Sequence, residues 1–204
     1  MTIDKIDEGY IKFECHFKKE VIEIPRELFA PLNYWRNFLL NKGWIGAYPD
    51  GIGFGNISIR IPGSNQFYIT GSATGSLPEL KTEHYALVEK CDPAGNIIWC
   101  KGLIQASAES MSHYTVYKTI PEAAAVVHIH NRFLWDKYLD VLPCTLKEVS
   151  YGTPEMAFEI ERILKLPEMK TKRVAVMGGH EEGIISYGTS VEEAVKAMLG
   201  LEDI

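Results

Sequence analysis

The stretch AAAVVHIHN, residues 123–131, decides the fold of this chain. Small and β-branched residues lead into two histidines separated by one isoleucine, a composition typical of a buried strand. Side chains alternate between the faces of a strand, so His128 and His130 share one face while Val127 and Ile129 share the other. Two imidazoles placed in this way can bind one divalent metal ion, although an HxH sequence can also simply end a buried strand and begin a turn.

A third metal ligand is available further along the chain, where MGGHEEGI contains His180. Three neutral imidazoles around Zn²⁺ leave the fourth tetrahedral position open, which is the arrangement of catalytic rather than structural zinc sites. Such an ion polarises a carbonyl or stabilises an enediolate as a Lewis acid. Imidazole sites accept several divalent metals, so Mn²⁺ is an alternative to zinc.

Glu109 is the candidate general base. It falls in the first turn of a helix predicted over residues 107–119, with Ser107 as the N-cap and Pro121 after its end. This helix comes just before the histidine strand, so the fold can bring the Glu109 carboxylate next to His128. The alternative is an acidic first-turn residue favoured only by the helix dipole. We expect His113, one turn later, to pack in the core or to contact a metal ligand rather than to bind the metal itself.

Another group of residues is suited to hold an anion, because it combines backbone N–H groups, hydroxyls and a predicted helix start. It consists of Gly55, Asn56, Ser72, Thr74, Gly75 and Ser107. Taken alone, the small-residue loop 70–76 can equally be a flexible surface loop. It matches neither the P-loop nor the dinucleotide-binding pattern.

Length and composition indicate one globular domain spanning residues 1–204. The chain is 46% hydrophobic and 24% charged, which is ordinary for a domain with a packed core. Its net charge of -6 and scattered basic residues argue against nucleic acid or a membrane surface as a partner. Four cysteines without a CxxC pair, and no apolar run long enough for a signal peptide or membrane span, favour a cytoplasmic location.

Strand and helix patterns alternate along the chain, but two hairpins come early. We therefore expect an α/β fold with three α/β/α layers and a central mixed, largely antiparallel sheet. A period-2 pattern in residues 10–24 predicts an extra N-terminal strand region within 1–24. The other strands are predicted at 57–61, 66–70, 85–90, 97–101, 123–130, 173–177 and 183–187. The helices are predicted at 28–39, 107–119, 132–139, 154–164 and 190–200.

Six ordered motifs in this chain resemble those of the class II aldolase/adducin family, and they cover about residues 26–200. They read GNISIR (55–60), TGSATG (70–75), SAES (107–110), VVHIH (126–130), GTPEMA (152–157) and GHEEGIISYGTSVEEA (179–194). In fuculose-phosphate-aldolase-like members the catalytic glutamate precedes the first histidine by the spacing found here between Glu109 and His128.

The resemblance implies a zinc-dependent lyase, an aldolase that cleaves a carbon–carbon bond of a small phosphorylated hydroxyketone sugar through a metal-bound enediolate. His128, His130 and His180 would be the ligands and Glu109 the base. Asn56, the loop hydroxyls and Ser107 would hold the phosphate. Similar proteins are homotetramers.

This chain also departs from the family pattern. Its late turn reads HEEG where the family has HG, and Ala108 replaces a serine that would offer a phosphate a hydroxyl. The segment that carries the family's acid tyrosine is missing, which leaves Tyr151 and Tyr138 as substitutes. The alternatives to an aldolase are therefore an epimerase, dehydratase or decarboxylase with a sugar or hydroxyacid substrate, or a non-catalytic adducin-like interaction module.

Overall fold

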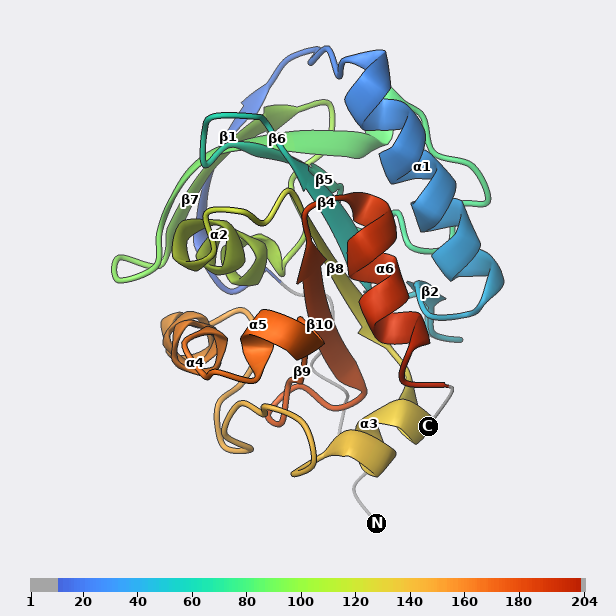
Figure 1. The fold of residues 1–204 in the computed structure, drawn as a ribbon. Coiled ribbons are helices and arrows are strands. Elements are labelled where there is room, and N and C mark those ends of the chain that lie inside the picture. The colour runs from blue at the N-terminus through green and yellow to red at the C-terminus, as the bar shows by residue number, and fades with distance from the viewer. Residues whose placement is uncertain (1–10, 203–204) are drawn as a thin grey trace.

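An eight-stranded mixed sheet organises the computed structural model, which describes residues 11–202 (Figure 1). The strand order is β1-β7-β6-β5-β4-β8-β10-β9, and every neighbouring pair is antiparallel except β1 with β7. The strands are β1 (Glu14–Lys19), β4 (Asn56–Arg60), β5 (Phe67–Thr70), β6 (Tyr85–Asp92), β7 (Ile97–Gly102), β8 (Ala125–His130), β9 (Val174–Val176) and β10 (Gly183–Gly188). The expected mixed, largely antiparallel sheet is confirmed.

Helices cover both faces of this sheet and give the fold its three layers (Figure 1). On one face α1, α3 and α6 bury side chains such as Leu39 and Val195 against Val127 of β8. On the other, α2, α4 and α5 bury side chains such as Met111 and Ile160 against its neighbour Val126. The helices are α1 (Arg26–Asn41), η1 (Thr82–His84), α2 (Ser110–Thr119), α3 (Arg132–Tyr138), α4 (Pro154–Leu164), α5 (Met169–Lys172) and α6 (Val191–Leu199).

Side-chain caps begin the two C-terminal amphipathic helices where the sequence predicts them. Thr153 accepts a hydrogen bond from the backbone N–H of Met156, and Pro154 occupies the first helical position. Ser190 caps α6 in the same way by accepting from the N–H of Glu193. These local signals fix the direction in which each helix leaves its loop.

Two helix starts differ from the prediction. Helix α2 begins at Ser110 and not at Ser107, so Glu109 occupies the N-cap position and is not part of the first turn. Residues 107–109 form a turn instead, in which the carbonyl of Ser107 accepts from both the N–H and the hydroxyl of Ser110. Helix α1 begins at Arg26, which places Pro31 inside the helix rather than in its first turn.

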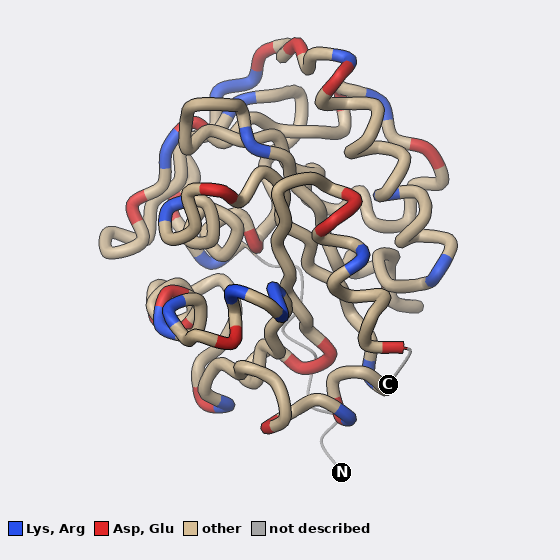
Figure 2. The backbone as a smooth tube through the Cα atoms, viewed as in Figure 1, with Lys and Arg blue, Asp and Glu red and all other residues tan. Residues whose placement is uncertain are grey.

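The N-terminal strand region is described from Ile11 onward, and residues 1–10 of that prediction lie outside the described part of the chain. Strand β1 lies at an edge of the sheet and pairs in parallel with β7. No helix within residues 11–202 is long and apolar enough to cross a bilayer. Basic and acidic residues are interspersed over the fold (Figure 2). Such a mixed distribution does not attract an anion from a distance, so the groups that touch the anion must hold it.

Strand β8 occupies a central position between β4 and β10. The register places Asn56 of β4 opposite His128 and Gly183 of β10 opposite His130. A short separate hairpin, β2 (Gly46–Ala47) and β3 (Gly53–Phe54), lies just before β4 in the chain. The candidate ligands and the glycine-rich segments therefore meet at one end of β8.

Candidate active site

The structure brings His128, His130 and His180 together. The first two lie at the end of β8, and His180 comes from the turn between β9 and β10. One nitrogen from each ring lies within 4.8 Å of the others, and all three side chains are buried. The ring centroids of each pair are 4.8 to 4.9 Å apart. Among the described residues, this is the group of histidine, cysteine and carboxylate side chains whose geometry suits a metal ion.

Hydrogen bonds assign the protons on two of these rings. His128 Nδ1 lies 3.2 Å from the carbonyl oxygen of Ile184, which can only accept, so Nδ1 carries the proton. His130 Nδ1 lies 2.9 Å from the hydroxyl of Tyr48, and that hydroxyl donates to the Glu182 carboxylate at 2.7 Å. The Tyr48 oxygen therefore accepts from His130 Nδ1. In both rings the lone pair is left on Nε2.

The two Nε2 atoms of His128 and His130 face each other at 3.1 Å. Two lone pairs at this distance cannot form a hydrogen bond, but a cation can bind both of them. Two nitrogens bound tetrahedrally to zinc lie about 3.3 Å apart, from zinc–nitrogen bonds of about 2.0–2.1 Å. Burial, and then the neighbouring imidazoles His180 and His130, hold the pKa of His128 well below its usual range. A neutral imidazole is the form that binds metal, so the residues present fit a divalent ion.

Gly183 permits the close approach of these rings. A Cβ atom at this position would lie 2.9 Å from the carbonyl oxygen of His180. It would also lie 3.1 Å from ring atoms of both His128 and His180. Because backbone and packed rings cannot move away easily, a side chain here would push His180 out of the cluster.

Glu109 lies beside the histidine cluster and is almost fully buried. Its Oε1 atom is 3.6 Å from Nδ1 of His180, and its Oε2 accepts a hydrogen bond from the hydroxyl of Ser112 at 2.6 Å. From the N-cap position the carboxylate contacts Ser112 in the first turn of α2 with one oxygen and faces the histidine cluster with the other. This is a position from which a carboxylate can exchange a proton with a bound substrate.

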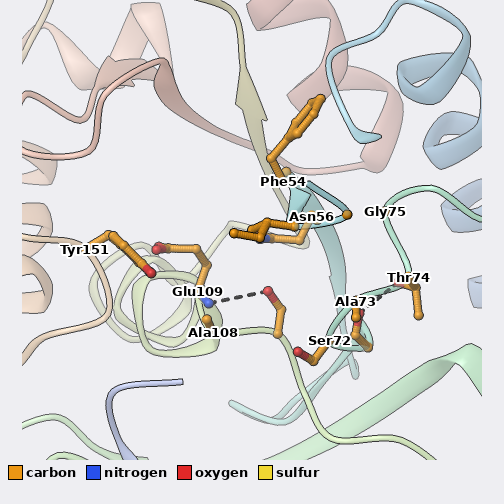
Figure 3. A pocket seen from close by; sticks show the side chains of 15 residues that line it. Phe54, Asn56, Ser72, Ala73, Thr74, Gly75, Ala108, Glu109 and Tyr151 are labelled. Carbon is orange, nitrogen blue, oxygen red and sulfur yellow. Dashed lines mark hydrogen bonds between the residues drawn. The ribbon is translucent and has the colours of Figure 1, made fainter. Parts of the chain in front are cut away.

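A pocket of about 230 Å³ opens next to Glu109 (Figure 3). All six residues that the sequence proposes for an anion line it: Gly55, Asn56, Ser72, Thr74, Gly75 and Ser107. The Oδ1 atom of Asn56 is buried and has no hydrogen-bond partner within residues 11–202. The Thr74 hydroxyl, by contrast, donates to the carbonyl of Gly71 inside the loop. The structure thus gathers the predicted residues, and the Thr74 hydroxyl proton is engaged within the loop whereas the Asn56 side-chain oxygen keeps its accepting capacity for a donor on a ligand.

Arg36 of α1 fixes the loop on the far side of the pocket. Its fully buried guanidinium donates to the carbonyls of Thr74, Gly75 and Leu77 at distances between 2.6 and 2.9 Å. These carbonyls point toward the helix and away from the pocket. The loop also approaches the backbone of Gly46 so closely that a Cβ on Gly75 would lie 1.9 Å from its carbonyl oxygen.

Tyr48 and Glu182 were not assigned to the site from the sequence, and Tyr151 was named only as one of two substitutes for the family's acid tyrosine. Tyr151 lines the pocket on the same side as Glu109 (Figure 3) and stacks on His180 with ring centroids 4.6 Å apart. The alternative tyrosine, Tyr138, is buried elsewhere and donates to the carbonyl of Leu201. Tyr48 and Glu182 reach His130 from segments 134 residues apart, and no local pattern could have paired them.

Residues 44–135 match the family model of the class II aldolase and adducin N-terminal domain. The match includes Glu109, His128 and His130 but ends before His180. Over these residues the match confirms the resemblance to the class II aldolase/adducin family seen in the sequence, and solved class II aldolases share the fold.

Individual relatives include solved aldolases of similar fold. The L-fuculose-1-phosphate aldolase of Thermus thermophilus has a TM-score of 0.63 and 24% identity, over 88% of this chain and 91% of that one. The sugar-phosphate aldolase of Thermotoga maritima has a TM-score of 0.65 and 18% identity, over 87% and 91%. At such identities the likeness is one of fold.

A decarboxylase is similar to part of the sequence. The 3-oxo-tetronate 4-phosphate decarboxylase of Haemophilus influenzae is 33% identical over 82 residues, which is 40% of this chain. The match covers 35% of that relative, about a third of its length.

Proposed function

We propose that this protein is a divalent-metal-dependent lyase that cleaves a carbon–carbon bond in a small phosphorylated hydroxyketone. The observation that carries the proposal is the buried cluster of three imidazoles with the Glu109 carboxylate beside it, next to a pocket lined by glycines and hydroxyl residues. His128, His130 and His180 would hold the ion, with Zn²⁺ as the first candidate and Mn²⁺ as the second. When bound, the ion supplies Lewis-acid polarisation of the substrate carbonyl.

Glu109 would move the proton on the reacting carbon. In cleavage, the hydroxyl of the carbon that becomes the aldehyde loses its proton, and the carbon–carbon bond breaks. The electron pair of that bond enters the enediolate of the other fragment. Glu109 in its protonated form then protonates the carbon of that fragment, and in the condensation direction its carboxylate removes the same proton. Tyr151, on the same side of the pocket, is our candidate for receiving the hydroxyl proton as a phenolate, and exchange with solvent then removes the proton from Tyr151 and returns one to Glu109.

The far side of the pocket would bind the phosphate. The loop that contains Ser72 and Gly75, the amide of Asn56 and the Ser107 turn line this space. The N–H of Ser72 donates to the carbonyl of Gln105, so the other backbone N–H groups of the loop would bind the anion. A phosphate held there would place the adjoining carbons between Glu109 and the histidine cluster. Binding of this remote group can position the reacting carbons.

Decarboxylation is the second candidate, and the partial similarity to a decarboxylase of a phosphorylated oxo-acid favours it. The bond that breaks then joins the reacting carbon to a carboxylate, and CO₂ replaces the aldehyde as the leaving fragment. The remaining fragment is again an enediolate that needs one proton. The same Glu109 would therefore serve both reactions.

The test loads the purified protein with Zn²⁺ and assays two phosphorylated compounds, L-fuculose 1-phosphate and 3-oxo-tetronate 4-phosphate. Aldehyde release and CO₂ release are measured separately. We expect turnover of at least one compound, and a loss of about 10²–10⁴-fold in Glu109→Gln with the metal content unchanged. Glu161→Gln, which changes a surface glutamate paired with Lys165, is the matched control and should keep full activity.

Two results would contradict the proposal. The first is equal turnover by the wild type and Glu109→Gln. The second is a wild-type protein that retains no stoichiometric divalent metal after loading, which would favour the adducin-like interaction module. A single domain, a homotetramer and a cytoplasmic location also stay predictions, and light scattering of the metal-loaded protein tests the tetramer.

A further inference from the structure

Glu182 approaches the histidine cluster from the HEEG turn, where this chain departs from the family's HG pattern. Its backbone has a φ of 68°, in the left-handed region that non-glycine residues rarely adopt. This conformation directs the side chain inward, where Oε2 accepts from the Tyr48 hydroxyl at 2.7 Å and lies 3.8 Å from Nδ1 of His130.

Tyr48 reaches the same Nδ1 atom of His130 from another segment of the chain. It lies in the hairpin between β2 and β3, and its ring packs on Phe54 with centroids 4.7 Å apart. Phe54 in turn packs on the ring of His130 at 5.5 Å. The hydroxyl of Tyr48 is thereby held between the Glu182 carboxylate and His130 Nδ1, at 2.7 and 2.9 Å.

Resting on the proposed metal binding, we propose that Tyr48 and Glu182 are positioning residues that set the metal affinity of His130. The carboxylate accepts the tyrosine proton, which makes the tyrosine oxygen an acceptor for the Nδ1 proton of His130. This chain of hydrogen bonds keeps the His130 lone pair on Nε2, fixes the orientation of the ring and raises the basicity of the nitrogen that faces His128. Partners of this kind typically change metal affinity by about 10- to 100-fold.

The neighbouring Glu181 has a different role and offers a matched control. Its side chain is exposed and forms an ion pair with Arg132, which is also exposed. Glu181 and Glu182 thus carry the same charge one residue apart, but the structure joins Glu182 alone to the His130 hydrogen-bond chain. If the turn acted on the metal site through its charge alone, removing the charge of either residue would change the metal affinity equally.

The experiment measures Zn²⁺ affinity by competition with a chromophoric chelator for the full-length protein. We expect Tyr48→Phe and Glu182→Gln each to weaken Zn²⁺ binding by about 10- to 100-fold, and Glu181→Gln to stay within about twofold. Because the two residues act through one chain of hydrogen bonds, the double variant should bind no more weakly than the weaker-binding single variant. The visible spectrum of bound Co²⁺ should change in Tyr48→Phe and Glu182→Gln and stay the same in Glu181→Gln.

The outcomes separate this inference from the proposed function. Unchanged affinity in Tyr48→Phe and Glu182→Gln, with tight binding by the wild type, overturns this inference and leaves the metal site standing. Equal weakening in Glu181→Gln and Glu182→Gln overturns it too, because charge alone would then explain the effect. A wild type that binds neither Zn²⁺ nor Co²⁺ overturns both. If Tyr48→Phe fails to fold, the comparison of Zn²⁺ affinity between Glu182→Gln and Glu181→Gln tests the inference without it.

Discussion

Tyr151 stacks on His180 with ring centroids 4.6 Å apart and an angle of 22° between the ring planes. The ammonium of Lys12 lies 3.9 Å from the centroid of the same tyrosine ring. A segment ahead of β1 and a loop ahead of α4 therefore meet at the candidate metal centre. The contact fixes the position of the tyrosine beside the pocket that also contains Glu109.

Tyr151→Phe should keep the stacking and remove only the hydroxyl. We expect kcat to fall by about 10²–10⁴-fold, the range for loss of a general acid or base, with little change in Zn²⁺ content. Tyr138→Phe is the control, because its hydroxyl donates to a backbone carbonyl in the core. Steady-state kinetics of both variants measure the effect, and equal kcat values in Tyr151→Phe and the wild type would remove Tyr151 from the chemistry.

Arg36→Lys should loosen the pocket loop. The planar guanidinium of Arg36 donates to three carbonyls at once, and the single ammonium of a lysine cannot reproduce this geometry. Each buried carbonyl left without a hydrogen bond costs about 1–3 kcal/mol. We expect the free energy of unfolding in urea to fall by about 2–4 kcal/mol, and KM for the phosphorylated substrate to rise. Arg26→Lys, at the exposed start of the same helix, should stay within about 0.5 kcal/mol. Similar losses in the two variants would contradict this account of the loop.

Stability should decrease as the pH falls, in part because of His113. Burial lowers the pKa of His113 to about 3, whereas an unfolded histidine titrates near 6.5. Between these values the unfolded chain binds a proton that the folded chain does not, so the free energy of unfolding falls by up to about 1.4 kcal/mol per pH unit. Urea unfolding between pH 7.5 and 4.5 measures this slope.

His113→Gln removes the titrating group and should reduce that slope by about one proton. Its absolute stability should also drop, because His113 Nδ1 shares a 2.7 Å hydrogen bond with Ser58. The two effects are distinguishable, since only the first depends on pH. If the free energy of unfolding fell with pH at the same slope in the variant and the wild type, His113 would not be the source of the pH dependence.

Removal of metal should lower the melting temperature. An ion present at about 1,000 times its dissociation constant stabilises the folded state by about 4 kcal/mol, which is roughly 8–16 °C for a chain of this size. We expect EDTA dialysis to lower Tm by this amount and added Zn²⁺ to restore it. His180→Ala should abolish the response to both treatments in differential scanning calorimetry. A wild-type Tm that does not respond to EDTA or Zn²⁺ would count against the metal site.

The sequence predicts most of the fold because its signals are local. The β-branched run of β8, the turn residues of the early hairpins and the caps at Thr153 and Ser190 each act within a few residues. The parallel pairing of β1 with β7 is different, since residue patterns do not specify the direction of an edge strand. The short helix α5 was also missed, because four residues are too few to show a helical period.

The site is predicted less completely than the fold. The HxH spacing alone identifies two candidate ligands, since strand geometry fixes their common face. The N-cap position of Glu109 was missed because the Ser107 turn competes with the first turn of the helix. The contacts of Tyr48, Glu182 and Tyr151 depend on how distant segments are brought together, so no property of a single segment indicates them.

The pairing of Asn56 with His128 across β4 and β8 bears on which molecules fit. The Cα atoms of opposite residues on adjacent strands of a sheet stay about 5 Å apart, so the backbone limits how far the two side chains can separate to admit a longer molecule. If Asn56 binds the phosphate end and the ion at His128 binds the carbonyl, the backbone limits the number of atoms that fit between those two groups. Compounds lengthened by one carbon between phosphate and carbonyl should then be poor substrates, while the far end of the molecule is free to vary.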